Sequence, residues 1–172
     1  MVTIISTEVL GGGRLANRQL GVDEMTHTIE RYLKRIETSG SSFRGQTLES
    51  RQSQQINMRF PTLSEASLAA IEVQRRISDL PPVSGVRLNV RIGIHTADNE
   101  DEALGVALQL MNLALPEQIL CGREVLLDQV HTIGVGMHDL QQITLEDDTQ
   151  FQVVELLWHD DNVPVSLTAT AV

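Results

Sequence analysis

The sequence is poor in cysteine, lysine and aromatic residues. Its 172 residues include one cysteine, Cys121, with one Trp, one Tyr and three Phe. A single cysteine excludes an intrachain disulfide and favours a reducing compartment. Lys34 is the one lysine beside twelve arginines. Any chemistry that requires a lysine therefore depends on that residue.

Cationic side chains are scarce overall. Thirteen Lys and Arg stand against 23 Asp and Glu, which gives a formal charge of −10. We expect no nucleic-acid partner, because binding a phosphate backbone requires clustered Lys and Arg. No run approaches the roughly 18–20 apolar residues of a membrane span, and the first residues lack the basic and apolar regions of a secretion signal. We therefore predict a soluble, cytoplasmic protein with no membrane partner.

The sequence does contain enough apolar residues for one core. Hydrophobic residues make up 41% of the chain, and a domain of about 150 residues already buries roughly 68–70% of its unfolded surface. We predict one domain at 1–158. The segment 159–172 is small and polar without a period, and we predict a linker or tail leading to a possible further module.

Hydrophobic periodicity predicts an alternation of strands and helices. Strands are expected at 2–8, 43–48, 55–60, 86–94, 118–121, 132–138 and 150–158. A first helix is expected at 22–38, with Gly40 as the stop. A second is expected to begin at the S/T-x-x-E capping box at 62–65 and to end before Pro81. Two more are expected, one from the acidic run 98–102 to 113 and one at 123–130. Segment 86–94 alternates strictly, with one apolar and one polar face.

The order of these elements is strand–helix–strand–strand–helix–strand, followed by smaller additions. This order is typical of the split βαβ arrangement. We predict an α+β fold, with a ferredoxin-like βαββαβ core, additional C-terminal α/β elements, and an antiparallel sheet with helices packed on one face.

Four segments resemble motifs of class III adenylate/guanylate cyclase catalytic domains. Segment 2–16 resembles their first strand and the glycine-containing loop after it. The stretch VRIGIHT at 90–96 is similar to the family's VRIGIHTG strand, and LALPEQIL at 113–120 resembles its AxPGQIL strand. Asp139-Leu140 with 153–156 resembles its closing segment. The likeness covers about residues 1–158 in the right order and implies the cyclase fold, as a degenerate member of the family.

The resemblance also implies a reaction, in which the ribose 3′-oxygen attacks the α-phosphate of a nucleoside triphosphate beside two metal ions held by two aspartates. Here Glu8 stands at the first aspartate position and Gln54 at the second. Ser50 stands at the base-recognising lysine and Gln109 at a catalytic asparagine, and segment 92–122 holds no arginine for the transition state. We therefore predict no enzymatic activity, no catalytic residue and no cofactor. Glu8 is expected to be a vestigial metal ligand or, alternatively, a solvated or hydrogen-bonded acid at the end of the strand.

Three glycines follow the first predicted strand. Gly11, Gly12 and Gly13 could form a vestigial phosphate loop from backbone N–H groups, or a turn that requires positive φ. The one lysine, Lys34, falls on the first predicted helix, and this scarcity of lysine disfavours tight binding of a nucleoside triphosphate.

The remaining candidate ligands are isolated. His95 and His138 lie at strand ends without a cysteine or histidine at zinc-ligand spacing, so we predict structural histidines with satisfied hydrogen bonds. Cys121 lacks a basic or Cys-x-x-Cys context and is predicted to be an inert thiol.

These observations favour a catalytically inactive cyclase-homology domain that acts as a regulatory, protein-interaction (dimerisation) module in bacterial-type signalling. The resemblance implies a homodimer, and a partner signalling protein is the alternative. Three further readings stay open: a divergent nucleotidyl cyclase with residual Mn²⁺-dependent activity, a nucleotide or cyclic-nucleotide sensor without turnover, and a ferredoxin-like domain that has these motifs by chance.

Overall fold

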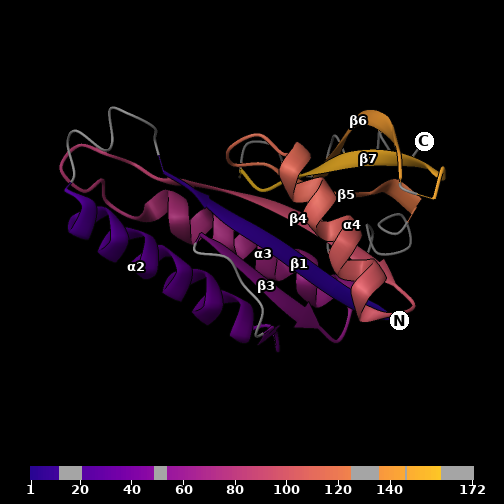
Figure 1. Ribbon diagram of the computed structural model, residues 1–172, viewed down its shortest axis with the longest axis horizontal. Helices are drawn as coiled ribbons and strands as arrows, with labels where there is room; N and C mark the ends of the chain where they lie inside the picture. The colour runs from indigo at the N-terminus through magenta and orange to yellow at the C-terminus, as the bar shows by residue number, and fades with distance from the viewer. Residues whose placement is uncertain (12–20, 49–53, 125–135, 146, 160–172) are drawn as a thin grey trace.

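A seven-stranded sheet organises the chain (Figure 1). The computed structural model describes residues 1–11, 21–48, 54–124, 136–145 and 147–159. The strand order is β2-β3-β1-β4-β5-β7-β6, and β4 and β5 pair in parallel while the other neighbours are antiparallel. The strands are β1 (Val2–Leu10), β2 (Gln46–Thr47), β3 (Gln55–Phe60), β4 (Asn89–Ala97), β5 (Ile119–Gly122), β6 (Gly136–Thr144) and β7 (Gln150–Leu157). The predicted α+β fold is confirmed, with a mixed sheet.

Helices cover both faces of the sheet. The ferredoxin-like part places α2 (Val22–Ser41) and α3 (Leu63–Asp79) on one face, over the main hydrophobic core. On β1, Ile5 joins this core while its neighbour Ile4 joins a second cluster under α4 (Glu100–Leu113), because successive strand residues point to opposite faces. The expectation that all helices lie on one face is therefore wrong for α4 (Figure 1).

Gly93 lets α4 lie directly on β4. A Cβ atom at this position would lie 2.2 Å from the carbonyl oxygen of Ala107 and 2.5 Å from the amide nitrogen of Met111. These are backbone atoms of α4, so they cannot move aside as a flexible side chain would. The glycine of the VRIGIHT segment thus sets the distance between helix and sheet.

The same close contact explains a difference in β4. The strand runs from Asn89 to Ala97, three residues later than predicted at each end. Its alternate face was expected to be polar, but α4 packs on that face at Gly93, and His95 on the same face is buried. Alternation within a short segment predicted the strand and could not show that a distant helix covers its second face.

Two other predicted boundaries are wrong. Gly40 does not end α2, which continues to Ser41. A Cβ at Gly40 would come within 2.4 Å of the Met58 sulfur, so this glycine makes room for β3. The expected strand at 43–48 shortens to Gln46–Thr47, since Arg44 just before it has a φ of 66°.

The capping box at the start of α3 is half formed. The hydroxyl of Thr62 accepts a hydrogen bond from the amide of Glu65 at 3.1 Å. The carboxylate of Glu65 does not return to Thr62 and instead accepts from Arg44 Nε at 2.8 Å. The helix still begins where the motif predicts.

The C-terminal part agrees with the sequence in α4, β5 and β7, and less well in β6. β6 begins at Gly136 and continues to Thr144, beyond the predicted 132–138. The predicted helix 123–130 and the start of that strand fall largely outside the described residues, as does the tail 160–172. No helix in the described part of the chain is long and apolar enough to cross a membrane. The cytoplasmic location stays a prediction.

Candidate functional site around Glu8 and α4

Glu8 lies in the middle of a row of polar residues across three strands. The sheet register pairs Glu8 of β1 with Gln55 of β3 on one side and with Arg91 of β4 on the other. Directly opposed side chains lie on the same face of a sheet. Gln55 Nε2 donates to Glu8 Oε2 at 3.1 Å, while Arg91 donates to Oε1 from Nε at 2.9 Å and from Nη2 at 2.6 Å.

Arg91 also binds the C-terminal end of α4. Its Nη1 donates to the carbonyl oxygen of Asn112 at 3.2 Å and to that of Ala114 at 3.5 Å. The last carbonyls of a helix lack intrahelical partners and carry partial negative charge. α4 has no basic residue in its own last turn, so β4 supplies the cation. Arg91 therefore joins Glu8, the sheet and the helix terminus.

The arrangement does not suit a divalent cation at Glu8. Both carboxylate oxygens already accept hydrogen bonds, one of them from a guanidinium, and a bound cation would have to displace that positive charge. In the part of the chain that the structure describes, no three His, Cys, Asp or Glu residues are grouped to hold a metal ion. The role of Glu8 as a vestigial metal ligand stays a prediction.

The register revises the position of the second predicted ligand. Gln55 faces Glu8, whereas the carbonyl of Gln54 accepts from the Val9 amide at 2.9 Å. Both candidates are neutral amides, so the shift by one residue leaves the charge unchanged. Ser50 and two of the three glycines lie outside the described residues.

Gly11 is the described member of the predicted phosphate loop, and it directly follows β1. A Cβ there would meet the Met25 sulfur at 3.9 Å and a Leu88 methyl at 4.0 Å, which is ordinary contact distance. Its surroundings are therefore apolar on that side. The assignment of Gly11, Gly12 and Gly13 to a phosphate loop stays a prediction.

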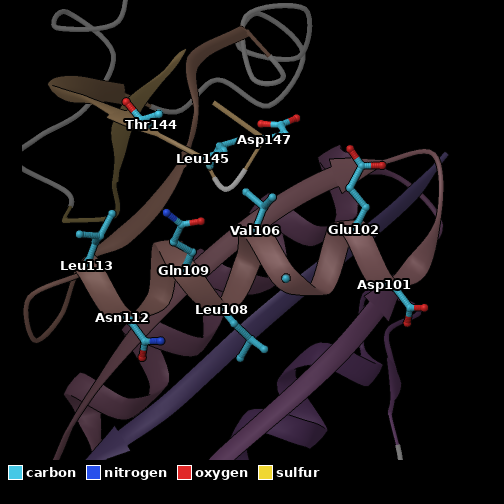
Figure 2. A pocket seen from close by; sticks show the side chains of 11 residues that line it. Asp101, Glu102, Val106, Leu108, Gln109, Asn112, Leu113, Thr144, Leu145 and Asp147 are labelled. Carbon is cyan, nitrogen blue, oxygen red and sulfur yellow. The ribbon is translucent and has the colours of Figure 1, made fainter. Parts of the chain in front are cut away.

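Gln109, at the predicted asparagine position, lies on the outer side of α4. It lines a groove of about 850 Å³ between α4 and the turn that joins β6 to β7. Figure 2 shows Gln109 and Val106 on the side of the helix that faces Leu145 of that turn. The groove is distinct from the Glu8 row, which lies beneath the end of the helix.

His95 is a buried polar residue whose environment the sequence did not reveal. Its ring packs edge-on against Phe151, with centroids 5.4 Å apart. Its Nδ1 atom is buried without a hydrogen-bond partner among the described residues. Burial lowers the pKa of His95 to about 4, because an apolar environment disfavours the charged imidazolium. The prediction that the hydrogen bonds of this histidine are satisfied is therefore wrong for Nδ1.

Cys121 is fully buried in β5. Burial raises the pKa of its thiol to about 12, although a hydrogen bond from the Gly122 backbone acts in the opposite direction. Because the thiolate is the reactive form, this supports the predicted inert thiol.

Glu117 occupies a strained turn before β5. It has a φ of 72°, a conformation that favours glycine, and it stands where the resembling motif AxPGQIL has its glycine. The turn is held by the Glu117 amide, which donates to Val90 at 2.8 Å, and by its carbonyl, which accepts from Trp158 Nε1 at 2.8 Å.

Comparison with known proteins identifies the fold. No protein-family model matches the chain, and no curated protein matches it. Solved structures do match. The adenylate/guanylate cyclase/hydrolase from Silicibacter pomeroyi is similar with a TM-score of 0.71 and 21% identity, over 91% of this chain and 95% of that one.

Two fungal domains match equally well in shape. The guanylate cyclase domain of RhGC from Catenaria anguillulae, solved in complex with GTP, has a TM-score of 0.73 and 11% identity. A non-canonical dimeric guanylyl cyclase domain of the RhoGC fusion protein from Blastocladiella emersonii has a TM-score of 0.73 and 13% identity. Each match covers 91% of this chain and 95% of the other.

The chain thus has the fold of class III adenylate/guanylate cyclase catalytic domains. The particular relatives named above share that fold at low sequence identity. The prediction that the chain is no enzyme is contradicted by these matches, because the fold that covers 91% of its length is that of solved cyclase catalytic domains. Substitutions at motif positions were insufficient grounds to exclude activity.

Proposed function

We propose that this chain is a regulatory association module with the nucleotidyl cyclase fold, and that it works as a homodimer in a bacterial-type signalling protein. The observation that carries the proposal is an exposed apolar surface at the C-terminal end of α4. Leu115 is 65% exposed and Leu113 is 40% exposed. Exposed apolar patches are typical of association sites, and these two leucines lie two positions apart in the sequence. The dimeric domain of similar fold named above supports a second copy as the partner.

The surface is held in a fixed position. The amide of Leu115 donates to the side-chain oxygen of Gln118 at 2.9 Å, and the preceding carbonyl of Ala114 accepts from Arg91. The leucine side chain is thus presented by a backbone tied to β4 and β5. A rigid surface loses less conformational entropy on association than a flexible one.

Light scattering at concentrations from 1 to 100 µM tests the dimer. The wild-type chain is expected to approach twice its monomer mass of 19.0 kDa, and Leu115→Glu is expected to stay monomeric, since burying a carboxylate at the contact is unfavourable. Leu68→Glu is the control, because Leu68 is another exposed leucine (37%) and lies on α3, on the opposite face of the sheet. A wild-type chain that is monomeric at 100 µM contradicts the proposal.

A second candidate is a divergent nucleotidyl cyclase. It is favoured by the shared fold with solved catalytic domains. Incubation with ATP or GTP and Mn²⁺, followed by detection of cyclic nucleotide and pyrophosphate, tests it. Activity that Glu8→Gln abolishes supports this candidate, and no product above the buffer control counts against it.

A further inference from the structure

The outer side of α4 forms one wall of the groove of about 850 Å³. Four lining residues, Glu102, Val106, Gln109 and Leu113, follow each other at intervals of four, three and four. This spacing places them on one stripe of the helix. The opposite wall is the turn with Leu145 (Figure 2). The stripe is therefore an amphipathic surface that faces a second element across open space.

The charges on the groove have one sign. Asp101, Glu102 and Asp147 line it, and no Lys or Arg occurs among the described residues of its lining. Glu102 and Asp147 come from different elements, and Figure 2 shows their side chains at the same end of the groove. Asp101 and Glu102 also complement the dipole of α4, as acids in its first turn. Asp147 has no such role.

Asp147 is fixed as an anion. Hydrogen bonds from the side chain and the backbone of Thr149 lower the pKa of its carboxyl below the usual value, and the Thr149 amide donates to Oδ1 at 3.0 Å. Like charges at one end of a groove repel each other and attract a cation. A nucleoside triphosphate, with its own negative charges, would be repelled there.

The remainder of the groove combines apolar and neutral polar side chains and has room. Apolar residues and the neutral polar residues Gln109, Asn112 and Thr144 line it, together with Gly105 of α4. A Cβ at Gly105 would meet nothing within 4 Å, so packing does not require this glycine. Glycine inside a helix is less stable than alanine by about 0.5–1 kcal/mol. The position leaves space for a side chain of a bound molecule.

We propose that this groove binds one cationic amphipathic helix of a partner protein. Arg or Lys side chains at one end of that helix would contact Glu102 and Asp147, and its apolar residues would cover Val106, Leu113 and Leu145. The stripe from Glu102 to Leu113 spans about 16 Å at 1.5 Å per residue, or three helical turns. The inference rests on the proposed role as an association module, and its groove shares Leu113 with the proposed dimer surface but does not include Leu115.

Three synthetic 16-residue helical peptides with the same Leu and Val positions test the proposal by fluorescence anisotropy. Their polar faces carry Arg and Lys, Gln, or Glu. The cationic peptide is expected to bind one per chain, at least tenfold more tightly than the Gln peptide, and more weakly in 0.5 M NaCl, because salt screens exposed charges. The double variant Glu102→Gln/Asp147→Asn is expected to weaken its binding at least tenfold, and Gly105→Gln to block it.

The control separates this site from general attraction to an acidic protein. Asp23→Asn/Glu30→Gln removes the same charge from α2, on the opposite face of the sheet, and is expected to change the affinity less than twofold. Equal weakening by the control overturns the proposal. So does equal binding of the Gln peptide, no binding, or binding that Gly105→Gln leaves unchanged.

Two further outcomes separate this inference from the proposed dimer. Leu115→Glu, which is expected to be monomeric, should bind the cationic peptide as the wild type does. If the peptide instead dissociates the wild-type dimer, a second copy occupies the groove, and the partner assigned here is wrong while the dimer stands.

Discussion

The guanidinium of Arg91 binds the carboxylate of Glu8 through two hydrogen bonds to a single oxygen, at 2.6 and 2.9 Å. Both side chains are mostly buried, with exposed fractions of 21% for Arg91 and 18% for Glu8. In this environment the attraction is screened less than at a surface, and each charge depends on the other. The position that the resemblance assigns to metal binding thus serves to link β1, β4 and α4.

Replacing Arg91 is expected to destabilise the fold more than replacing Glu8. Arg91→Met should lower the free energy of unfolding by about 2–3 kcal/mol, since it leaves a mostly buried carboxylate without its cation and frees the end of α4. Glu8→Gln should lower it by about 1 kcal/mol, because Arg91 keeps the carbonyls of Asn112 and Ala114.

Urea denaturation of the two single variants and the double variant measures these changes. The double variant is expected to lose less than the sum of the two, which reports the coupling between the side chains. Strict additivity would show that the ion pair contributes nothing beyond its separate parts.

The free energy of unfolding is expected to decrease as the pH is lowered, because His95 is buried in its neutral form. The pKa of His95 is about 4 in the folded chain and near 6.5 when the side chain is exposed. The unfolded state therefore binds more protons between these values, so the contribution is complete above pH 6.5 and is lost as the pH falls toward 4. The loss is about 3 kcal/mol between pH 7 and 4. In urea titrations, the free energy of unfolding of His95→Leu should change between pH 7 and 4 by about 3 kcal/mol less than that of the wild type. An equal change in both proteins would contradict the burial of His95.

The glycines at positions 93 and 105 should respond in opposite ways to alanine. Gly93→Ala forces a methyl group against the backbone of Ala107 and Met111, and a loss above about 3 kcal/mol is expected, because overpacking displaces the whole helix. Gly105→Ala meets open space and should raise stability by about 0.5–1 kcal/mol. Thermal unfolding by circular dichroism compares the two, and similar midpoints would contradict the packing of α4 on β4.

Local patterns in the sequence predicted single elements but not the contacts between them. The alternation of 2–8 and the three-and-four spacing of 22–36 report on contacts within one element, and both elements occur as predicted. The cyclase fold followed from the order of the motifs. The covered second face of β4 depends on α4, which lies later in the chain, so no local pattern contains it.

For the candidate site, the sequence predicted one residue but not its partner or the groove. The glutamate at position 8 stands out as the acid at the expected place on the first strand. Its partner Arg91 lies on the predicted polar face of an alternating strand, and the pairing of 8 with 91 requires the register of β1 and β4. The groove along α4 combines a helix with a turn more than 30 residues away, and no spacing rule connects them.

The turn before β5 offers a gain in stability. Glu117 adopts a φ of 72° and its side chain is exposed. The left-handed conformation costs about 1–2 kcal/mol for a residue with a Cβ, and part of this is offset by the greater freedom of glycine in the unfolded chain. Glu117→Gly should raise the free energy of unfolding by about 0.5–1 kcal/mol in urea titrations. A loss of stability would show that the side chain makes a contribution larger than the strain.

The proposed meeting of two copies at Leu115 can be tested most directly by cross-linking. Because Cys121 is buried and its thiol has a pKa of about 12, the variants Leu115→Cys and Leu68→Cys each carry one reactive thiol. Under mild oxidation, a disulfide-linked dimer is expected for Leu115→Cys and not for Leu68→Cys or the wild type. Equal linkage of both variants, or none in Leu115→Cys, would contradict the association surface.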